Sequence, residues 1–229
     1  RQRFSHHRGN RLMPYCKHPL FADQDGKKVF AWSDRNGDEN VQEDELTFRD
    51  IGTRLRGAWQ HLGVNGSLTA YFPMTNGTIW EFPVSGFTKA KAPEYDLDAA
   101  GPLPGARYGG GQGSVLPGLD GETVMSHSNP LKAFAADNGE LLWTYPNAWA
   151  GVHGSHRAPD GEPGLLRGTF AFVGSARTGA GEEVLMVNSN VGEWHAFTRD
   201  GLYVANLFTA DPAEIDWPEK AEPGSLLDD

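Results

Sequence analysis

The chain has 229 residues, of which 30 are acidic and 20 are basic, so its formal net charge is −10. This length is enough to bury a sizeable core in one large domain or two small ones. The acidic balance argues against a nucleic-acid-binding surface, which needs a basic face. No apolar run approaches the length of a membrane-spanning helix, so we expect no membrane span.

The N-terminal segment, residues 1–19, begins RQRFSHHRGN, with neither a methionine at position 1 nor the apolar region of a signal peptide. We therefore expect it to continue from a larger precursor. The only cysteine, Cys16, allows no intrachain disulfide and does not settle the compartment. Cys16 with His6, His7 and His18 could bind zinc or copper, but the spacing is weak evidence and their role stays open.

Short strands dominate the expected secondary structure. The 29 glycines and 15 prolines interrupt almost every window in which a helical period could develop. Between turn signals such as Asn-Gly and Asp-Gly lie runs rich in β-branched and aromatic residues. In chain order these runs are 27–33, 68–74, 78–84, 122–128, 140–145, 169–175, 183–189, 193–198 and 202–208.

A repeat organises these runs, because a turn is followed by a strand that carries a tryptophan at Trp80, Trp143 and Trp194. Together with Trp32, the tryptophans recur at intervals of about 50 to 60 residues, which is close to the period of a β-propeller blade. We therefore expect an all-β fold of the β-propeller class. A β-sandwich with scattered tryptophans is the alternative.

The segment 131–145, LKAFAADNGELLWTY, resembles the blade repeat of the PQQ-like (quinoprotein alcohol dehydrogenase-like) β-propellers. Ala133 and Phe134 in a strand, then Asp137, Gly139 and Trp143, match the pattern of that repeat. The resemblance covers roughly residues 20–210 and implies about four blades. The remainder of a ring would come from the precursor or from other subunits. Residues 211–229 are acidic and contain proline, which indicates a tail or linker.

A twelve-residue stretch, Asp34 to Glu45, follows the EF-hand-type pattern of calcium ligands at positions 1, 3, 5, 7, 9 and 12. The six candidate ligands, with position 7 binding through its backbone carbonyl, are Asp34, Asn36, Asp38, Asn40, Gln42 and Glu45. Position 6, normally glycine, is Glu39, and a positive φ there would weaken the site. The run before the stretch is strand-like, and the segment EDELTFRDI, residues 43–51, could begin a short helix. We expect calcium to stabilise this loop; an acidic turn without an ion is the alternative.

Catalytic residues are not evident in the sequence. His127, His153, His156 and Arg157 are weak candidates, and a second set of transition-metal ligands among them is a weak possibility. The PQQ-like resemblance implies a quinone site closed by an adjacent-cysteine disulfide, which this chain lacks, so PQQ is not expected.

Taken together, these patterns favour a calcium-stabilised scaffold or binding segment of an extracellular or periplasmic multidomain protein, with a polysaccharide or a protein subunit as ligand. The alternative is a propeller enzyme, carbohydrate-active or an oxidoreductase, with a histidine-lined central channel. Convergence of His127, His153 and His156 in one pocket would favour the enzyme.

Overall fold

The computed structural model describes residues 2–4, 28–55, 63–107, 115–126 and 129–208. The two terminal domains expected from sequence, 1–19 and 211–229, lie almost entirely outside these ranges, so the expected division of the chain stays a prediction. Helix is scarce in the described residues, as expected: there is one α-turn, α1 (Val152–Ser155), and a short 3-10 segment, η2 (Glu43–Glu45).

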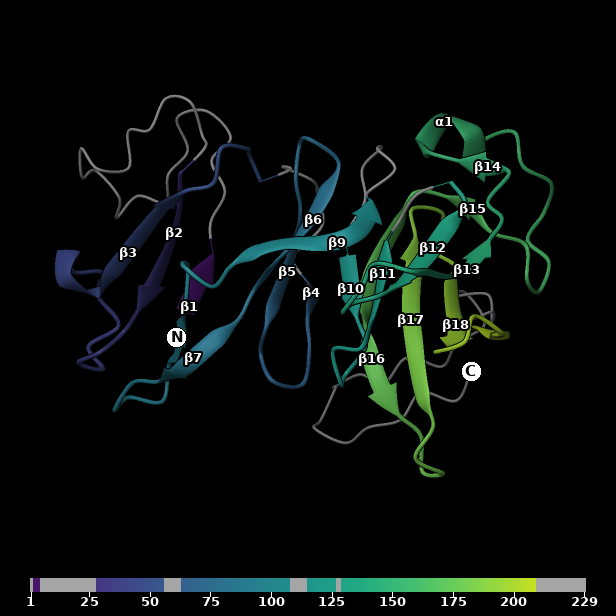
Figure 1. The fold of residues 1–229 in the computed structure, drawn as a ribbon. Coiled ribbons are helices and arrows are strands. Elements are labelled where there is room, and N and C mark those ends of the chain that lie inside the picture. The colour runs from purple at the N-terminus through teal and green to yellow at the C-terminus, as the bar shows by residue number, and fades with distance from the viewer. Residues whose placement is uncertain (1, 5–27, 56–62, 108–114, 127–128, 209–229) are drawn as a thin grey trace, which may run out of the picture.

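Four sheets follow one another along the chain (Figure 1). The first sheet has the order β1 (Gln2–Phe4), β2 (Lys28–Ser33), β3 (Leu46–Asp50). The second sheet has the order β4 (Gly63–Val64), β5 (Ala70–Pro73), β6 (Thr78–Phe82), β9 (Gly101–Arg107). The third sheet has the order β10 (Val115–Pro117), β11 (Thr123–Ser126), β12 (Leu131–Ala135), β13 (Leu141–Tyr145). The fourth sheet has the order β16 (Phe170–Arg177), β17 (Glu183–Ser189), β18 (Trp194–Thr198), β19 (Tyr203–Leu207).

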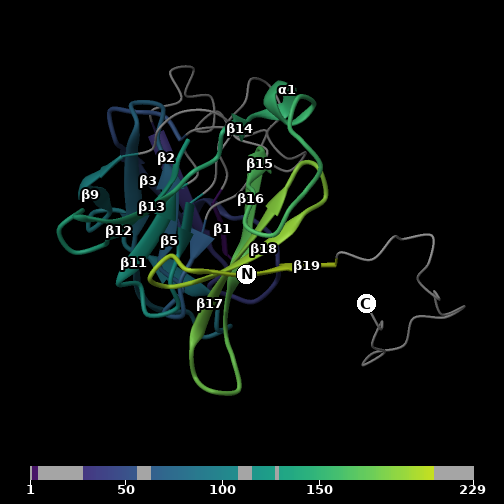
Figure 2. The same cartoon turned by 90° about the vertical axis from the view of Figure 1, so that its right-hand side faces the viewer.

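Two small ribbons interrupt this series. The hairpin of β7 (Val84–Phe87) and β8 (Pro93–Tyr95) is inserted between the last two strands of the second sheet. The parallel pair β14 (Trp149–Ala150) and β15 (Arg167–Gly168) lies with α1 between the third and fourth sheets along the chain. Figures 1 and 2 both show α1 at one end of the molecule and the β16–β17 hairpin extending from the other.

Each pair of neighbouring sheets shares a hydrophobic cluster. Val29, Ala31, Phe72 and Phe82 belong to the cluster between the first and second sheets. The cluster between the second and third sheets contains Tyr71, Ile79, Leu103, Val115, Val124 and Phe134. The cluster between the third and fourth sheets contains Leu116, Met125, Leu131, Phe170, Leu185, Val187 and Phe197. The sheets therefore stack face to face.

The alternation of side chains along a strand explains how one short strand contributes to the hydrophobic clusters on both faces of its sheet. Val115 and Leu116 are neighbours on β10, yet they lie in different clusters. Val124 and Met125 on β11 are divided in the same way. Because successive side chains of a strand point to opposite faces, a run that is apolar throughout buries both faces of its sheet. Four-stranded antiparallel sheets stacked in sequence order are the blades of a β-propeller, which confirms the expected fold class.

The tryptophan repeat proved less regular than the spacing implied. Trp80 lies in β6, the third strand of its sheet, and Trp194 lies in β18, also a third strand. Trp143 lies in β13, a fourth strand. The sequence period was therefore close to the blade period although the tryptophans are not equivalent positions.

One local expectation needs correction. The segment 43–51 was considered as the start of a short helix, but only its first three residues are helical, in the 3-10 segment η2, and β3 follows at once. Apolar and polar residues alternate over Leu46–Arg49, which suits a strand, and Phe30 of β2 lies opposite Phe48.

Candidate calcium loop and buried polar sites

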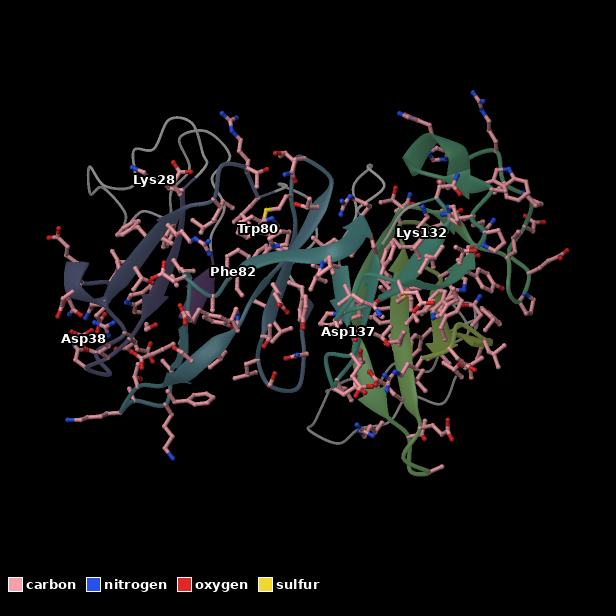
Figure 3. All side chains as sticks on the ribbon, viewed as in Figure 1. Lys28, Asp38, Trp80, Phe82, Lys132 and Asp137 are labelled. Atoms are coloured by element: carbon pink, nitrogen blue, oxygen red, sulfur yellow. The ribbon has the colours of Figure 1, made fainter. Side chains whose placement is uncertain are left out.

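The candidate calcium loop, residues 34–45, connects β2 to β3. The pair of the β2–β3 ladder nearest to the loop is Trp32 of β2 opposite Leu46 of β3. The loop is thus a hairpin connection within one sheet. Figure 3 shows Asp38 at the lower end of this sheet, opposite the end at which Lys28 lies. Asp137, in the β12–β13 turn of the third sheet, lies on the same lower side.

The last residue of the loop, Glu45, anchors it to the sheet. Its side chain is only 2% exposed. Oε2 accepts a hydrogen bond from Trp32 Nε1 at 2.8 Å, and Oε1 accepts from the backbone N–H groups of Arg35 at 2.7 Å and Asn36 at 3.3 Å. Three donors therefore satisfy one buried carboxylate, which suits its burial.

The first residue of the loop, Asp34, is also a buried carboxylate that accepts hydrogen bonds from backbone N–H groups of the loop. It is 3% exposed, and its carboxylate accepts from the N–H groups of Gly37 at 2.7 Å and Glu39 at 3.2 Å. These bonds wrap the first half of the loop around Asp34. Gly37 and Glu39 both have positive φ, 83° and 61°. The strain expected at position 6 is therefore present, and the glycine shares the bend.

The exposed residues of the loop form a separate polar group. Asp38 Oδ2 accepts from Gln42 Nε2 at 2.6 Å and from Asn36 Nδ2 at 3.2 Å, while Oδ1 accepts from the Asn40 N–H at 2.7 Å. The Asn40 N–H, aided by the two amides, lowers the pKa of the Asp38 carboxyl below its usual value. The carboxylate thus stays charged at neutral pH.

The oxygen donors of this loop are of the kind that calcium prefers, since they are carboxylates, side-chain amides and backbone carbonyls. Within the residues that the structure describes, however, no group of three or more His, Cys, Asp or Glu side chains is placed to hold a metal ion. Asp34 and Glu45 face backbone N–H groups, and Asp38 faces amides. The donor set fits calcium by type, and calcium binding at these positions stays a prediction.

The histidines proposed for catalysis lie elsewhere. His153 lies in α1 and His156 caps its C-terminal end, so the pair sits on a single helical turn. His153, His156 and Arg157 are all exposed. His127 lies outside the described residues, as do Cys16 and the N-terminal histidines. The convergence of His127, His153 and His156 therefore stays a prediction.

A polar cleft that the sequence did not indicate lies between the third and fourth sheets, with a volume of about 710 Å³. Arg199 crosses it, pairing with Asp120 at 2.6 Å and Glu122 at 2.5 Å. The hydrogen bond that Arg199 donates to the Glu122 carboxylate is the main cause of a raised pKa at Arg199. Glu183 accepts from the Leu119 N–H at 2.7 Å. These contacts tie turns of adjacent blades together, and His153 and His156 do not line the cleft.

The sequence also did not indicate a buried polar group in the fourth sheet. His195 of β18 is 0% exposed, and its Nε2 lies 3.6 Å from Glu193 Oε2. Arg167 pairs with the other oxygen of Glu193 at 2.7 Å. Burial lowers the pKa of His195, and the charge of Glu193 opposes that shift. The strand period would have placed His195 on the same face as Phe197, two residues later.

Comparisons with known proteins give only distant structural similarities. No known protein family matches the chain, and no curated protein is similar to it. Among solved structures, BamB from Moraxella catarrhalis is similar at a TM-score of 0.32 and 15% identity, over 80% of this chain and 58% of that one. Hsv2 from Kluyveromyces lactis is similar at a TM-score of 0.30 and 14% identity, over 75% and 55%.

Both alignments leave more than a third of the other protein uncovered, so this chain spans a little over half the length of either. The stacked four-stranded antiparallel sheets define the class of protein, which is a β-propeller. In the described part of the chain, no helix has the length and apolar character needed to cross a membrane.

Proposed function

We propose that this chain is a non-catalytic segment of a β-propeller that serves as a scaffold for another protein subunit, in extracellular or periplasmic surroundings. The PQQ-like type of its repeats belongs to the same proposal. The observation that carries the proposal is the far face of the fourth sheet. The first three sheets each share a cluster with the sheet that follows.

The far face of the fourth sheet is defined by strand register. On β17, Leu185 and Val187 belong to the cluster shared with the third sheet, so Met186 points the other way. Met186 lies opposite Ala196, and Trp194 lies opposite Leu207. Met186 and Trp194 are half-buried and Leu207 is exposed. An apolar sheet face of this kind is suited to pack against a further β-sheet.

Site-specific crosslinking tests this proposal. A photo-reactive phenylalanine analogue at Met186 in the full chain, expressed in its source organism, is expected to form a discrete adduct with peptides of one partner protein. The same analogue at Lys89, an exposed residue in the β7–β8 turn, is the matched control. No adduct at 186, or the same adducts at both positions, would contradict the proposal. A carbohydrate adduct would replace the protein subunit with a polysaccharide.

Calcium is proposed as the ligand of loop 34–45. The loop carries three carboxylates, those of Asp34, Asp38 and Glu45, at the spacing of an EF-hand-type loop, and this chemistry and spacing support the assignment. A bound ion would add its binding energy to folding, so millimolar calcium is expected to raise the melting temperature and EGTA to reverse the rise.

The matched variant for this test is Asp38→Asn, because Asp38 is exposed and holds no buried group. The variant is expected to melt like the parent protein in EGTA and to lose the rise with calcium. If the parent protein releases no heat on titration with millimolar calcium and its melting temperature does not move, calcium is not its ligand.

A further inference from the structure

The polar cleft between the third and fourth sheets is lined by more acidic than basic side chains. Four of its lining residues carry carboxylates and two carry guanidinium groups: Asp120, Glu182, Glu183, Asp200, Arg177 and Arg199. One wall is the β16–β17 hairpin, which extends beyond the neighbouring turns (Figures 1 and 2). The volume of about 710 Å³ lies within the range of ligand-binding clefts, and the charge balance favours a positive ligand.

Arg199 shows how the carboxylates of this cleft hold a cation. Its guanidinium pairs with Asp120 at 2.6 Å and with Glu122 at 2.5 Å. Within the part of the chain that the structure describes, the other three carboxylates of the cleft form no ion pair. Arg177 is exposed and offsets at most one of these charges. Negative charge therefore remains in the cleft beside a cation that is already held there.

Glu183 points to a ligand independently of the charge balance. The residue is only 9% exposed, and its Oε1 accepts a hydrogen bond from the Leu119 N–H at 2.7 Å. Its other oxygen, Oε2, has no hydrogen-bond donor among the described residues. A carboxylate oxygen that is nearly buried and lacks a donor costs free energy, which a charged N–H donor in the cleft would recover. Glu183 therefore marks a position for a cation.

We propose that the cleft binds a lysine-containing segment of another protein, with a lysine ammonium group at Glu183. An ammonium group suits a carboxylate with one free oxygen, whereas the fork of a guanidinium group needs two. Leu142, which is 47% exposed, lines the same cleft and offers an apolar surface to the methylene groups of the lysine. The net charge of −10 attracts a basic segment and repels a second copy of this chain.

The arrangement of the carboxylates favours an extended cationic chain over a metal ion. In the described residues, no three His, Cys, Asp or Glu side chains are placed around one point where a metal ion could bind. The acidic residues instead come from three different turns or strand ends that border the cleft. The inference goes beyond the proposed function, because it concerns this cleft and not the far face of the fourth sheet.

The probe is a fluorescein-labelled hexapeptide in which lysine alternates with leucine, added to the full chain in EGTA. Fluorescence anisotropy is expected to show saturable binding that weakens as sodium chloride rises from about 50 to about 300 mM. The same peptide with glutamate in place of lysine should not bind. Glu183→Gln keeps an oxygen for the Leu119 N–H but removes the charge, so binding should weaken about tenfold. Glu162→Gln removes the same charge at an exposed residue outside the cleft and should leave binding unchanged.

Carbodiimide coupling, which joins lysine amines to nearby carboxylates, locates the contact without any variant. Mass spectrometry is expected to find the peptide on Glu182 or Asp200, the exposed carboxylates of the cleft, and not on Glu162. Absence of binding at about 1 mM peptide would overturn the inference, as would equal losses in Glu183→Gln and Glu162→Gln. Spermine that binds as tightly as the peptide would overturn the assignment to a protein segment. The adducts at Met186 test the far face alone, so either proposal can fail without the other.

Discussion

Glu45 in the first sheet and His195 in the fourth are both polar side chains with almost no exposure, yet their surroundings differ. The Glu45 carboxylate accepts from three N–H donors. Neither ring nitrogen of His195 has a hydrogen-bond partner, and Glu193 Oε2 beside it has none either. The comparison shows that burial of a polar group does not by itself reveal what the group contributes to the stability of the fold. A satisfied group holds its surroundings in place, whereas an unsatisfied one costs stability.

The largest effect is expected at Glu45. Glu45→Ala would leave the Trp32 indole and two backbone N–H groups without an acceptor, so we expect a loss of about 3 kcal/mol in the free energy of unfolding. Urea denaturation of the variant and the parent protein measures the difference. Glu45→Gln keeps one acceptor oxygen and should lose less. Equal and small losses in both variants would mean that the carboxylate does not anchor the loop.

A smaller effect is expected from pH at His195. Its pKa in the folded protein lies below the value of an unfolded histidine, near 6.5. Protonation therefore favours the unfolded state. The contribution of neutral His195 to the free energy of unfolding is complete above about pH 6.5 and is lost as the pH falls toward the pKa of the folded protein. One proton gives a slope of at most about 1.4 kcal/mol per pH unit.

His195→Leu isolates this contribution from other titrating groups. Glu193 and Arg167 face His195 and remain in the variant. The slope of stability between pH 5 and 6.5 should be shallower in the variant than in the parent protein, and stability at neutral pH should change little, because an unpartnered polar ring is replaced by an apolar group. An unchanged slope would show that His195 is not the titrating group.

The smallest effect is expected at Gly37, which lies in the half of the loop held by Asp34. At φ 83°, Gly37→Ala should cost about 1 kcal/mol in backbone strain. The added Cβ would meet only Ala90 Cβ, at 3.4 Å. Gly139→Ala in the β12–β13 turn is the contrast, since its Cβ would overlap the Pro104 carbonyl. Melting temperatures should fall much further for Gly139→Ala, because packing on the next sheet, and not a carboxylate, holds that turn.

Much of the strand content followed from local pattern. The runs that include β2, β5, β6, β11, β13 and β16 to β19 were recognised from β-branched and aromatic residues between turns. β10 was missed because Val115–Pro117 is short and follows a glycine-rich run. β3 was not recognised as a strand because the acidic residues at the start of segment 43–51 suggested a short helix, and only those residues are helical, in η2. Short strands depend on their neighbours, which a local pattern does not contain.

The sequence by itself determined the period of the strands, the all-β class and the polar character of the 34–45 loop, because these depend on residues close together in the chain. The tertiary structure alone decided which faces are shared between sheets, which carboxylates are buried, and that β19 is an edge. Tyr71 and Phe72 are neighbours on β5 whose partners lie in different sheets. Those partners are distant in sequence, and only the stacking of the sheets brings them into contact.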